Sequence, residues 1–255
     1  MLRTWKAAGS TVLLTFVWSA YDTLCEECLS QVACSENDED LERDITQLLE
    51  PRIHRAMTGY EPFDVQHGPY EDESRMAPPA QPPQYDMAFV LRSNPRAMWP
   101  LEAKVLRTDG SVAEYVKAIQ CNFLTCRYSP FSSEAAMLGY LLAGDCESAF
   151  ANIAKKGKWK LVAHTHFPER DHRTSDHERE VPKEKPYPIR FRCHHILLRL
   201  GACGSDRIVI RRCRFWRGCG VCPRRGRGGQ RRDRREVEGA RRTVSAANVP
   251  ERREW

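Results

Sequence analysis

The chain has 255 residues, of which 41% are hydrophobic, which suffices for one domain of about 150 to 200 residues with extensions. Its longest apolar stretch, residues 11–20, is far shorter than the roughly 20 residues that a membrane-spanning helix needs, which argues against a membrane protein. The formal charge of +6 is uneven, because residues 201–255 carry sixteen arginines against six acids and leave the remainder mildly acidic.

The N-terminal residues predict an amphipathic helix. Apolar side chains recur three and four residues apart on one face: Trp5, Ala8, Leu13, Val12, Phe16, Val17, Ala20 and Leu24. The basic residues Arg3 and Lys6 ahead of this run are also typical of a signal peptide, but the helical spacing favours the helix. Residues 1–36 are therefore expected to form an N-terminal helical extension.

A second helix is predicted to begin after Asn37, which can cap it ahead of a first turn rich in acids. Its apolar residues repeat with helical period: Leu41, Ile45, Leu48, Leu49 and Ile53. Pro51 is expected to end or kink this helix. The proline-rich residues 59–84 then predict an exposed connection with one short strand near Phe63–His67.

Between residues 85 and 106 the apolar period changes to two, which indicates a β-hairpin. We expect strands over residues 85–91 and 99–106, joined by a turn over residues 93–95. A helix over residues 112–124, capped near Asp109-Gly110-Ser111, should follow.

Two further apolar runs, residues 135–142 and residues 194–200, are candidate strands, although the first suits a helix equally. This order of elements predicts a mixed α/β domain over residues 37–200. Residues 201–255, with many arginines and few apolar side chains, are expected to form a disordered basic tail.

Three charged residues stand out on the predicted hairpin: Asp86 on its first strand, and Glu102 and Lys104 on its second. Because side chains alternate along a strand, Glu102 and Lys104 share one face while their apolar neighbours take the other. Charges in such apolar strands are costly to bury, so they are usually paired, bound to metal or exposed.

The spacing Asp86-x15-Glu102-Ala103-Lys104 resembles the signature of the PD-(D/E)xK nuclease superfamily, over about residues 37–142. The resemblance implies an α/β, restriction-endonuclease-like core with a mixed β-sheet flanked by helices. In that fold a helix precedes a β-meander, and the first acid lies where two central strands diverge. Tyr85 stands where the first motif has proline, a departure that does not touch a metal ligand.

The resemblance also implies roles for these residues. Asp86 and Glu102, with the backbone carbonyl of Ala103, would hold Mg²⁺, for which Mn²⁺ could substitute, because hard oxygen ligands suit such ions. The metal would polarise the scissile phosphate and activate water, and Lys104 would orient that water or stabilise the developing charge.

Further candidate residues lie on the two predicted helices. Helical geometry puts Glu42 on the edge of its apolar face, between Leu49 and Ile53, where related nucleases often carry a glutamate that reaches the metal; the alternative is a solvated edge residue. Lys117 and Gln120, one turn apart, resemble residues that position phosphate in some branches, and an ordinary exposed helix face is the alternative.

The predicted function is a metal-dependent nuclease acting on DNA rather than RNA, with a homodimer as a possible assembly. The alternative is a non-catalytic module that keeps the fold and binds nucleic acid or protein through its basic tail. The intact set Asp86, Glu102 and Lys104 favours the enzyme. Eleven scattered cysteines fit a reducing compartment, so a cytoplasmic location is expected.

Other cysteines and histidines could bind zinc or another transition metal. Two Cys-x-x-Cys pairs occur, each with a nearby third cysteine: Cys25 and Cys28 with Cys34, and Cys219 and Cys222 with Cys213. Four histidines, His164, His166, His172 and His177, gather near Asp171 and Asp176. For the histidines the alternative is a hydrated polar loop, and for His194 and His195 it is the polar end of a terminal strand.

Overall fold

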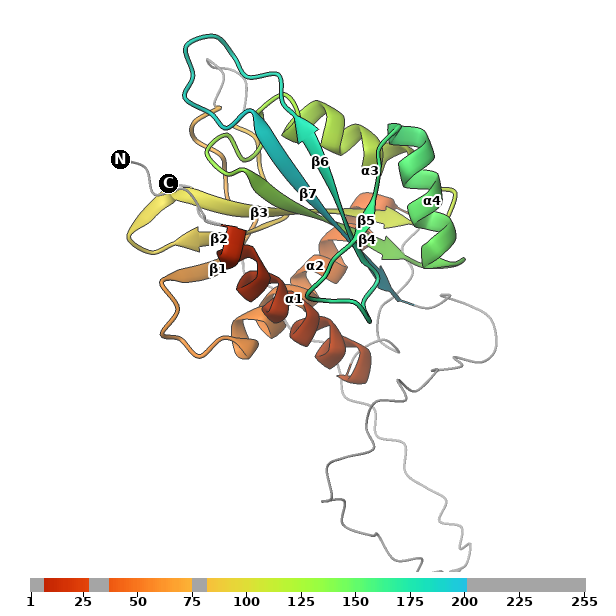
Figure 1. Ribbon diagram of the computed structural model, residues 1–255. Helices are drawn as coiled ribbons and strands as arrows, with labels where there is room; N and C mark the ends of the chain where they lie inside the picture. Colours follow the sequence, from red (N-terminus) through yellow and green to blue (C-terminus); the bar gives the residue numbers. More distant parts are fainter. Residues whose placement is uncertain (1–6, 28–36, 75–81, 201–255) are drawn as a thin grey trace, which may run out of the picture. The chain divides into compact units, whose positions relative to one another are not determined.

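The computed structural model describes residues 7–27, 37–74 and 82–200 of the chain. The chain divides into two units, Met1–Val209 and Ile210–Trp255, and every described residue belongs to the first. This unit is a seven-stranded mixed β-sheet with helices packed on both faces, as predicted (Figure 1). The predicted disordered tail, residues 201–255, lies outside the described residues.

The sheet has a parallel centre and antiparallel flanks, in the order β1-β2-β3-β4-β7-β6-β5. Its strands are β1 (Phe63–His67), β2 (Met87–Leu91), β3 (Asn94–Leu106), β4 (Glu134–Leu141), β5 (Val162–Ala163), β6 (His172–Glu178) and β7 (Arg190–Arg199). Strand β4 runs parallel to both β3 and β7, and every one of its residues is buried. Apolar side chains on both of its faces explain this, because helices cover both sides of a parallel sheet.

Two helix pairs cover the sheet. The helices are α1 (Ala7–Glu27), α2 (Asp38–Ala56), α3 (Ala113–Ala118), which continues as a π-helical turn (Ile119–Phe123), and α4 (Cys146–Gly157). One buried apolar cluster joins α1 and α2 to one face of the sheet, and a second joins α3 and α4 to the other (Figure 1). Helix α1 thus shares a core with α2 and the sheet. No helix in the described part of the chain combines the length and apolar character needed to cross a bilayer.

Helix α1 confirms the predicted amphipathic helix, but the side of the helix that is buried differs from the predicted side. Leu13, Val17 and Leu24 are fully buried, whereas Val12, which the sequence placed on the apolar face, is 48% exposed. The buried stripe instead runs through Leu14 and its neighbours toward α2 and the sheet. Trp5, the first residue of the predicted stripe, lies outside the described residues.

Helix α2 begins as predicted, because the side chain of Asn37 accepts a hydrogen bond from the backbone N–H of Glu39 at 3.0 Å. Of the two outcomes expected for Pro51, an end or a kink, the structure contradicts the end. The helix continues to Ala56, and Ile53 beyond the proline is fully buried. Packing of the apolar stripe against the core therefore outweighs the backbone hydrogen bond that proline removes.

The later half of the chain contains more regular structure than the sequence indicated. Strand β3 begins at Asn94, so the predicted turn over residues 93–95 is shorter than expected, and β7 begins at Arg190, before the predicted residue 194. Helix α4 was missed, although Asp145 caps it by accepting from the N–H of Ser148 at 2.9 Å. Residues 172–178, predicted as a polar loop, form strand β6, whose backbone pairs with β7.

Candidate functional site

An acidic cluster lies where β2 and β3 diverge. The ladder between these strands starts at Met87 and Leu101, so Asp86 immediately precedes it and Glu102 lies just beyond it on β3. Strand β3 continues from there alongside β4 only. The carboxylate of Asp86 spans this divergence by accepting the backbone N–H of Ala103 at 2.6 Å, which fixes its orientation.

Lys104 ties the cluster to helix α2. Its ammonium donates to Oε1 of Glu42 at 2.6 Å and to the carbonyl oxygen of Ala103 at 2.6 Å, and it lies 3.5 Å from Oε1 of Glu102. The second oxygen of Glu42 accepts the backbone N–H of Val105 at 3.3 Å. The Glu42 side chain, 13% exposed, thus lies in the cluster and not at a solvated helix edge.

Burial makes this cluster electrostatically unfavourable without a further cation. It raises the pKa of Asp86 and of Glu42, although the Lys104 charge opposes both shifts. The pKa of Glu102 lies well above its usual value, because burial and then the charges of Asp86 and Glu42 disfavour its ionised form. Burial alone would lower the pKa of Lys104, but the three surrounding carboxylates raise it above normal, so the ammonium stays charged.

These residues fit a divalent cation. Three carboxylates face a single ammonium, and Oε2 of Glu102 is buried with no hydrogen-bond partner among the described residues. An unpaired buried carboxylate oxygen is costly, and a hard cation such as Mg²⁺ would satisfy it. The carbonyl oxygen of Ala103 accepts from the same ammonium and would offer such a cation a further oxygen at this point of β3.

Tyr85 anchors the backbone ahead of Asp86. It is fully buried, its hydroxyl donates to the carboxylate of Glu71, and it accepts the backbone N–H of Ser129 at 2.8 Å. A buried hydroxyl with two hydrogen-bond partners fixes the position of this segment. No local pattern predicts the roles of Glu71 and Ser129, because these residues are 14 and 44 positions away from Tyr85 in the chain.

The two predicted phosphate-binding residues lie on the exposed side of α3 and the π-helical turn. Lys117 forms a surface ion pair with Glu114 at 3.0 Å, one turn earlier, and Gln120 is exposed. The contacts described for Lys117 thus join it to its own helix rather than to the acidic cluster. Their role in binding phosphate stays a prediction.

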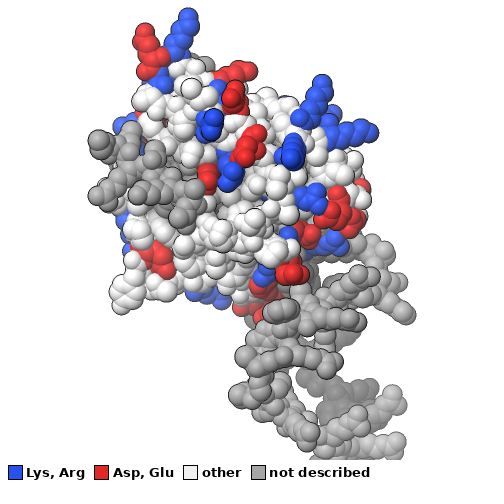
Figure 2. Space-filling view, viewed as in Figure 1, with Lys and Arg blue, Asp and Glu red and all other residues white. Residues whose placement is uncertain are grey.

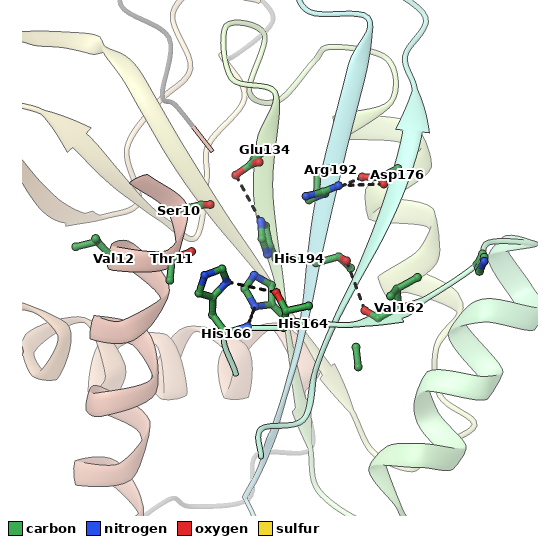
Figure 3. A pocket seen from close by; sticks show the side chains of 14 residues that line it. Ser10, Thr11, Val12, Glu134, Val162, His164, His166, Asp176, Arg192 and His194 are labelled. Atoms are coloured by element: carbon green, nitrogen blue, oxygen red, sulfur yellow. Dashed lines mark hydrogen bonds and ion pairs between the residues drawn. The ribbon is translucent and has the colours of Figure 1, made fainter. Parts of the chain in front are cut away.

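A second group of polar residues lines a cavity of about 960 Å³ beside α1, β5, β6 and β7 (Figure 3). His164 and His194, which line this cavity, and His172 beside them have ring nitrogens within 4.8 Å of one another. The predicted cluster combines His164 and His172 with His166 and His177. It does not include His194, which lies on another strand. His177 instead forms a hydrogen bond with Ser175, and both side chains lie on the face of β6 opposite to His172.

The predicted cysteine sites are only partly described. Cys25 lies in α1 and is half-buried, whereas Cys28 and Cys34 lie outside the described residues. The second set, Cys213, Cys219 and Cys222, lies outside them as well.

Comparison with known proteins finds no matching family, no matching curated protein and no matching solved structure for this chain. Its function must therefore be argued from the geometry of its own residues.

Proposed function

We propose that the protein is a metal-dependent nuclease that hydrolyses phosphodiester bonds, with DNA as the preferred substrate. One observation carries the proposal: Glu42, Asp86, Glu102 and Lys104, from three elements, converge in one buried cluster whose acids outnumber its single cation. Burying an excess of carboxylates lowers the stability of the fold. Such an excess is expected at a site that binds a divalent metal, because the ion offsets the repulsion.

The order of elements supports the same proposal. Helix α2 precedes the antiparallel meander β1-β2-β3, and α3 then leads to β4, which lies parallel to β3. This is the helix and meander arrangement that the resemblance to the PD-(D/E)xK nucleases implies. Asp86 also lies at the divergence of two central strands, where that resemblance expects the first acid.

In this proposal Asp86, Glu102 and the carbonyl of Ala103 hold the metal, and Glu42 reaches it directly or through water. When bound, a divalent ion polarises the scissile phosphate and lowers the pKa of an attacking water. The chain's part is to fix these oxygens, and the hydrogen bond from Ala103 to Asp86 does so for one carboxylate.

Lys104 supplies the positive charge of the site. Its raised pKa keeps it protonated throughout the physiological range, so it acts as a donor and not as a base. It can stabilise the additional negative charge that develops on the phosphate during attack. Glu42 and the Ala103 carbonyl orient the ammonium, which makes Glu42 a positioning residue as well as a possible metal ligand.

The proposal rests on this cluster and not on a basic surface. On the face drawn in Figure 2, lysines and arginines are interspersed with aspartates and glutamates. Such a mixed surface does not by itself attract a phosphate backbone.

The test is incubation of the purified full-length protein with plasmid, single-stranded DNA and RNA, each with Mg²⁺ and with EDTA. We expect cleavage of DNA in Mg²⁺ and none in EDTA. Glu102→Gln should abolish cleavage, whereas Glu39→Gln, which removes an exposed acid from the first turn of α2, should leave it unchanged. No Mg²⁺-dependent cleavage of any substrate, or equal activity in both variants, would overturn the proposal.

A further inference from the structure

A triad of histidines outside the acidic cluster is brought together by strand pairing. Strands β6 and β7 are antiparallel, with Thr174 opposite His194 and His172 opposite Ile196, so the alternation of side chains puts His172 and His194 on the same face. His164 follows β5, and its backbone N–H donates to the carbonyl of His172 at 3.1 Å. Three separate segments of the backbone therefore position the three rings.

One nitrogen-to-nitrogen distance in the triad is that of two ligands of one metal ion, and the ligand atoms of all three rings lie within 4.8 Å of one another. Nε2 of His172 lies 3.2 Å from Nδ1 of His194, and the ring of His164 stacks on that of His172 with centroids 4.4 Å apart. Zinc binds imidazole nitrogen at about 2.0 to 2.1 Å with tetrahedral angles, which separates two ligand nitrogens by roughly 3.3 Å. The pair His172 and His194 already has this separation.

We propose that His164, His172 and His194 form a site for a transition-metal ion of the Zn²⁺ class, distinct from the acidic cluster. Imidazole nitrogen suits Zn²⁺ and its neighbours in the first transition row, whereas Mg²⁺ prefers oxygen. The two proposed sites would therefore select different metals.

The competing explanation is a hydrogen bond between two neutral rings, and the outer ring nitrogens of the pair have the same surroundings in either case. Nδ1 of His172 and Nε2 of His194 are buried without a hydrogen-bond partner among the described residues. If Nδ1 of His194 binds a metal, its Nε2 carries the proton and faces Oε2 of Glu134, 3.6 Å away (Figure 3). A carboxylate behind a ligating histidine is the usual support that fixes the tautomer and orientation of such a ring.

The surroundings of the triad are largely buried. Burial is the main cause that lowers the pKa of His172 to about 2 and that of His164 to about 4. Trp18 and Phe167 pack against His172 and complete an apolar wall around the rings.

One side of the triad remains open. His164 and His194 line the cavity of about 960 Å³, together with His166 and Glu134. Three protein ligands with the remaining position facing solvent are typical of zinc sites that bind water or a small ligand, in contrast to closed structural sites. Binding requires one local change: Nδ1 of His164 now accepts the backbone N–H of His166 at 3.2 Å, and the ring must release or rotate away from this bond.

The test is a titration of the metal-free, reduced full-length protein with Co²⁺, followed by visible absorption, and competition with Zn²⁺. We expect one equivalent of Co²⁺ to give the intense visible bands of a four-coordinate nitrogen site, without the sulfur-to-cobalt charge-transfer band that the cysteines would produce. Zn²⁺ should displace these bands and Mg²⁺ should not.

Two variants assign the signal. His164→Gln, which alters the most exposed member of the triad, should remove the nitrogen-site bands, whereas His177→Gln, on the opposite face of β6, should retain them. Circular dichroism and thermal melts confirm that both variants are folded; if His164→Gln does not fold, His194→Gln takes its place. Identical spectra in the wild type and a folded triad variant, or wild-type bands of purely thiolate character, would overturn the proposal.

Discussion

The acidic cluster at β2 and β3 and the histidine triad at β6 and β7 are both buried polar groups on the same sheet. Burial shifts the pKa values of the two groups in opposite directions. The acidic cluster retains formal charge, and burial raises the pKa of all three carboxyl groups against the opposing effect of Lys104. In the triad, burial instead lowers the pKa of His172 and of His164, which leaves these two rings neutral.

This difference indicates what each region can bind. Buried carboxylates in excess need a hard cation to offset their repulsion, so metal binding should stabilise the fold most where the charge is greatest. Neutral imidazoles have no such repulsion and can pack stably without a metal. The acidic cluster should therefore gain stability from Mg²⁺, while the triad should respond to Zn²⁺ or Co²⁺.

The largest expected effect concerns catalysis at the acidic cluster. Lys104→Ala should reduce cleavage by about a hundredfold to a thousandfold, the cost of removing a group that stabilises developing charge. The double variant Lys104→Ala/Asp86→Asn should be about as inactive as either single variant, because both residues act on the same reacting group. Single-turnover rates with Mg²⁺ measure this, and additive losses would show that the two residues work independently.

A smaller effect is expected for Glu42, whose contact with the site passes through Lys104. Glu42→Gln should slow cleavage by roughly tenfold to a hundredfold, in the range of losses for residues that orient a ligand, and should weaken stabilisation by Mg²⁺. Glu39→Gln, an exposed acid in the first turn of the same helix, is the matched control and should do neither. Thermal unfolding midpoints measured across a Mg²⁺ titration test this prediction. Identical curves for the two variants would show that Glu42 does not contribute to the site.

Much of the acidic cluster could be predicted from the sequence because its signals are local. Asp86, Glu102 and Lys104 belong to a short pattern on a hairpin, and helical period put Glu42 on the edge of the apolar face of its helix. The histidine triad could not be assembled in this way. His194 lies near His172 because β6 pairs with β7. Residues 172–178 have no alternation of apolar side chains that would predict a strand.

Helix α1 shows the same limit. Its amphipathic period was readable, but which residues of the stripe face the core depends on α2 and the sheet, and Val12 was placed on the wrong side. Local pattern thus determines that an element exists, whereas its rotation and partners depend on contacts between distant segments.

Stability measurements sharpen the contrast between the two regions. In EDTA, Glu102→Gln should raise the thermal unfolding midpoint, because it removes a buried charge that repels Asp86 and Glu42. Mg²⁺ should then stabilise the wild type and not the variant. A variant that is less stable than the wild type in EDTA would mean that Glu102 is satisfied by its ion pair with Lys104 and needs no metal.

The smallest expected effect is a pH dependence from a histidine outside both clusters. Burial lowers the pKa of His177 to about 4, below the value of about 6.5 that it regains on unfolding. The unfolded chain therefore binds a proton first, and stability is lost as pH falls from about 6.5 toward 4. Between pH 7 and pH 5 this loss should be about 1 to 2 kcal/mol, after allowance for partial exposure.

Urea unfolding of the wild type and of His177→Gln at both pH values measures this contribution. The variant should lose less stability than the wild type on acidification. Equal losses in the two proteins would place the acid sensitivity elsewhere in the chain.

Metal replacement tests the central claim most directly, because it asks which of the two regions carries the chemistry. The full-length protein, stripped of metal with a chelator, is supplied with Mg²⁺ alone or with Zn²⁺ alone, and DNA cleavage is followed in the wild type and in Asp86→Asn. We predict that Mg²⁺ restores cleavage in the wild type, that Zn²⁺ alone does not, and that Asp86→Asn remains inactive with either ion. Recovery with Zn²⁺ alone, or Mg²⁺-dependent cleavage by Asp86→Asn, would contradict a nuclease site at the acidic cluster.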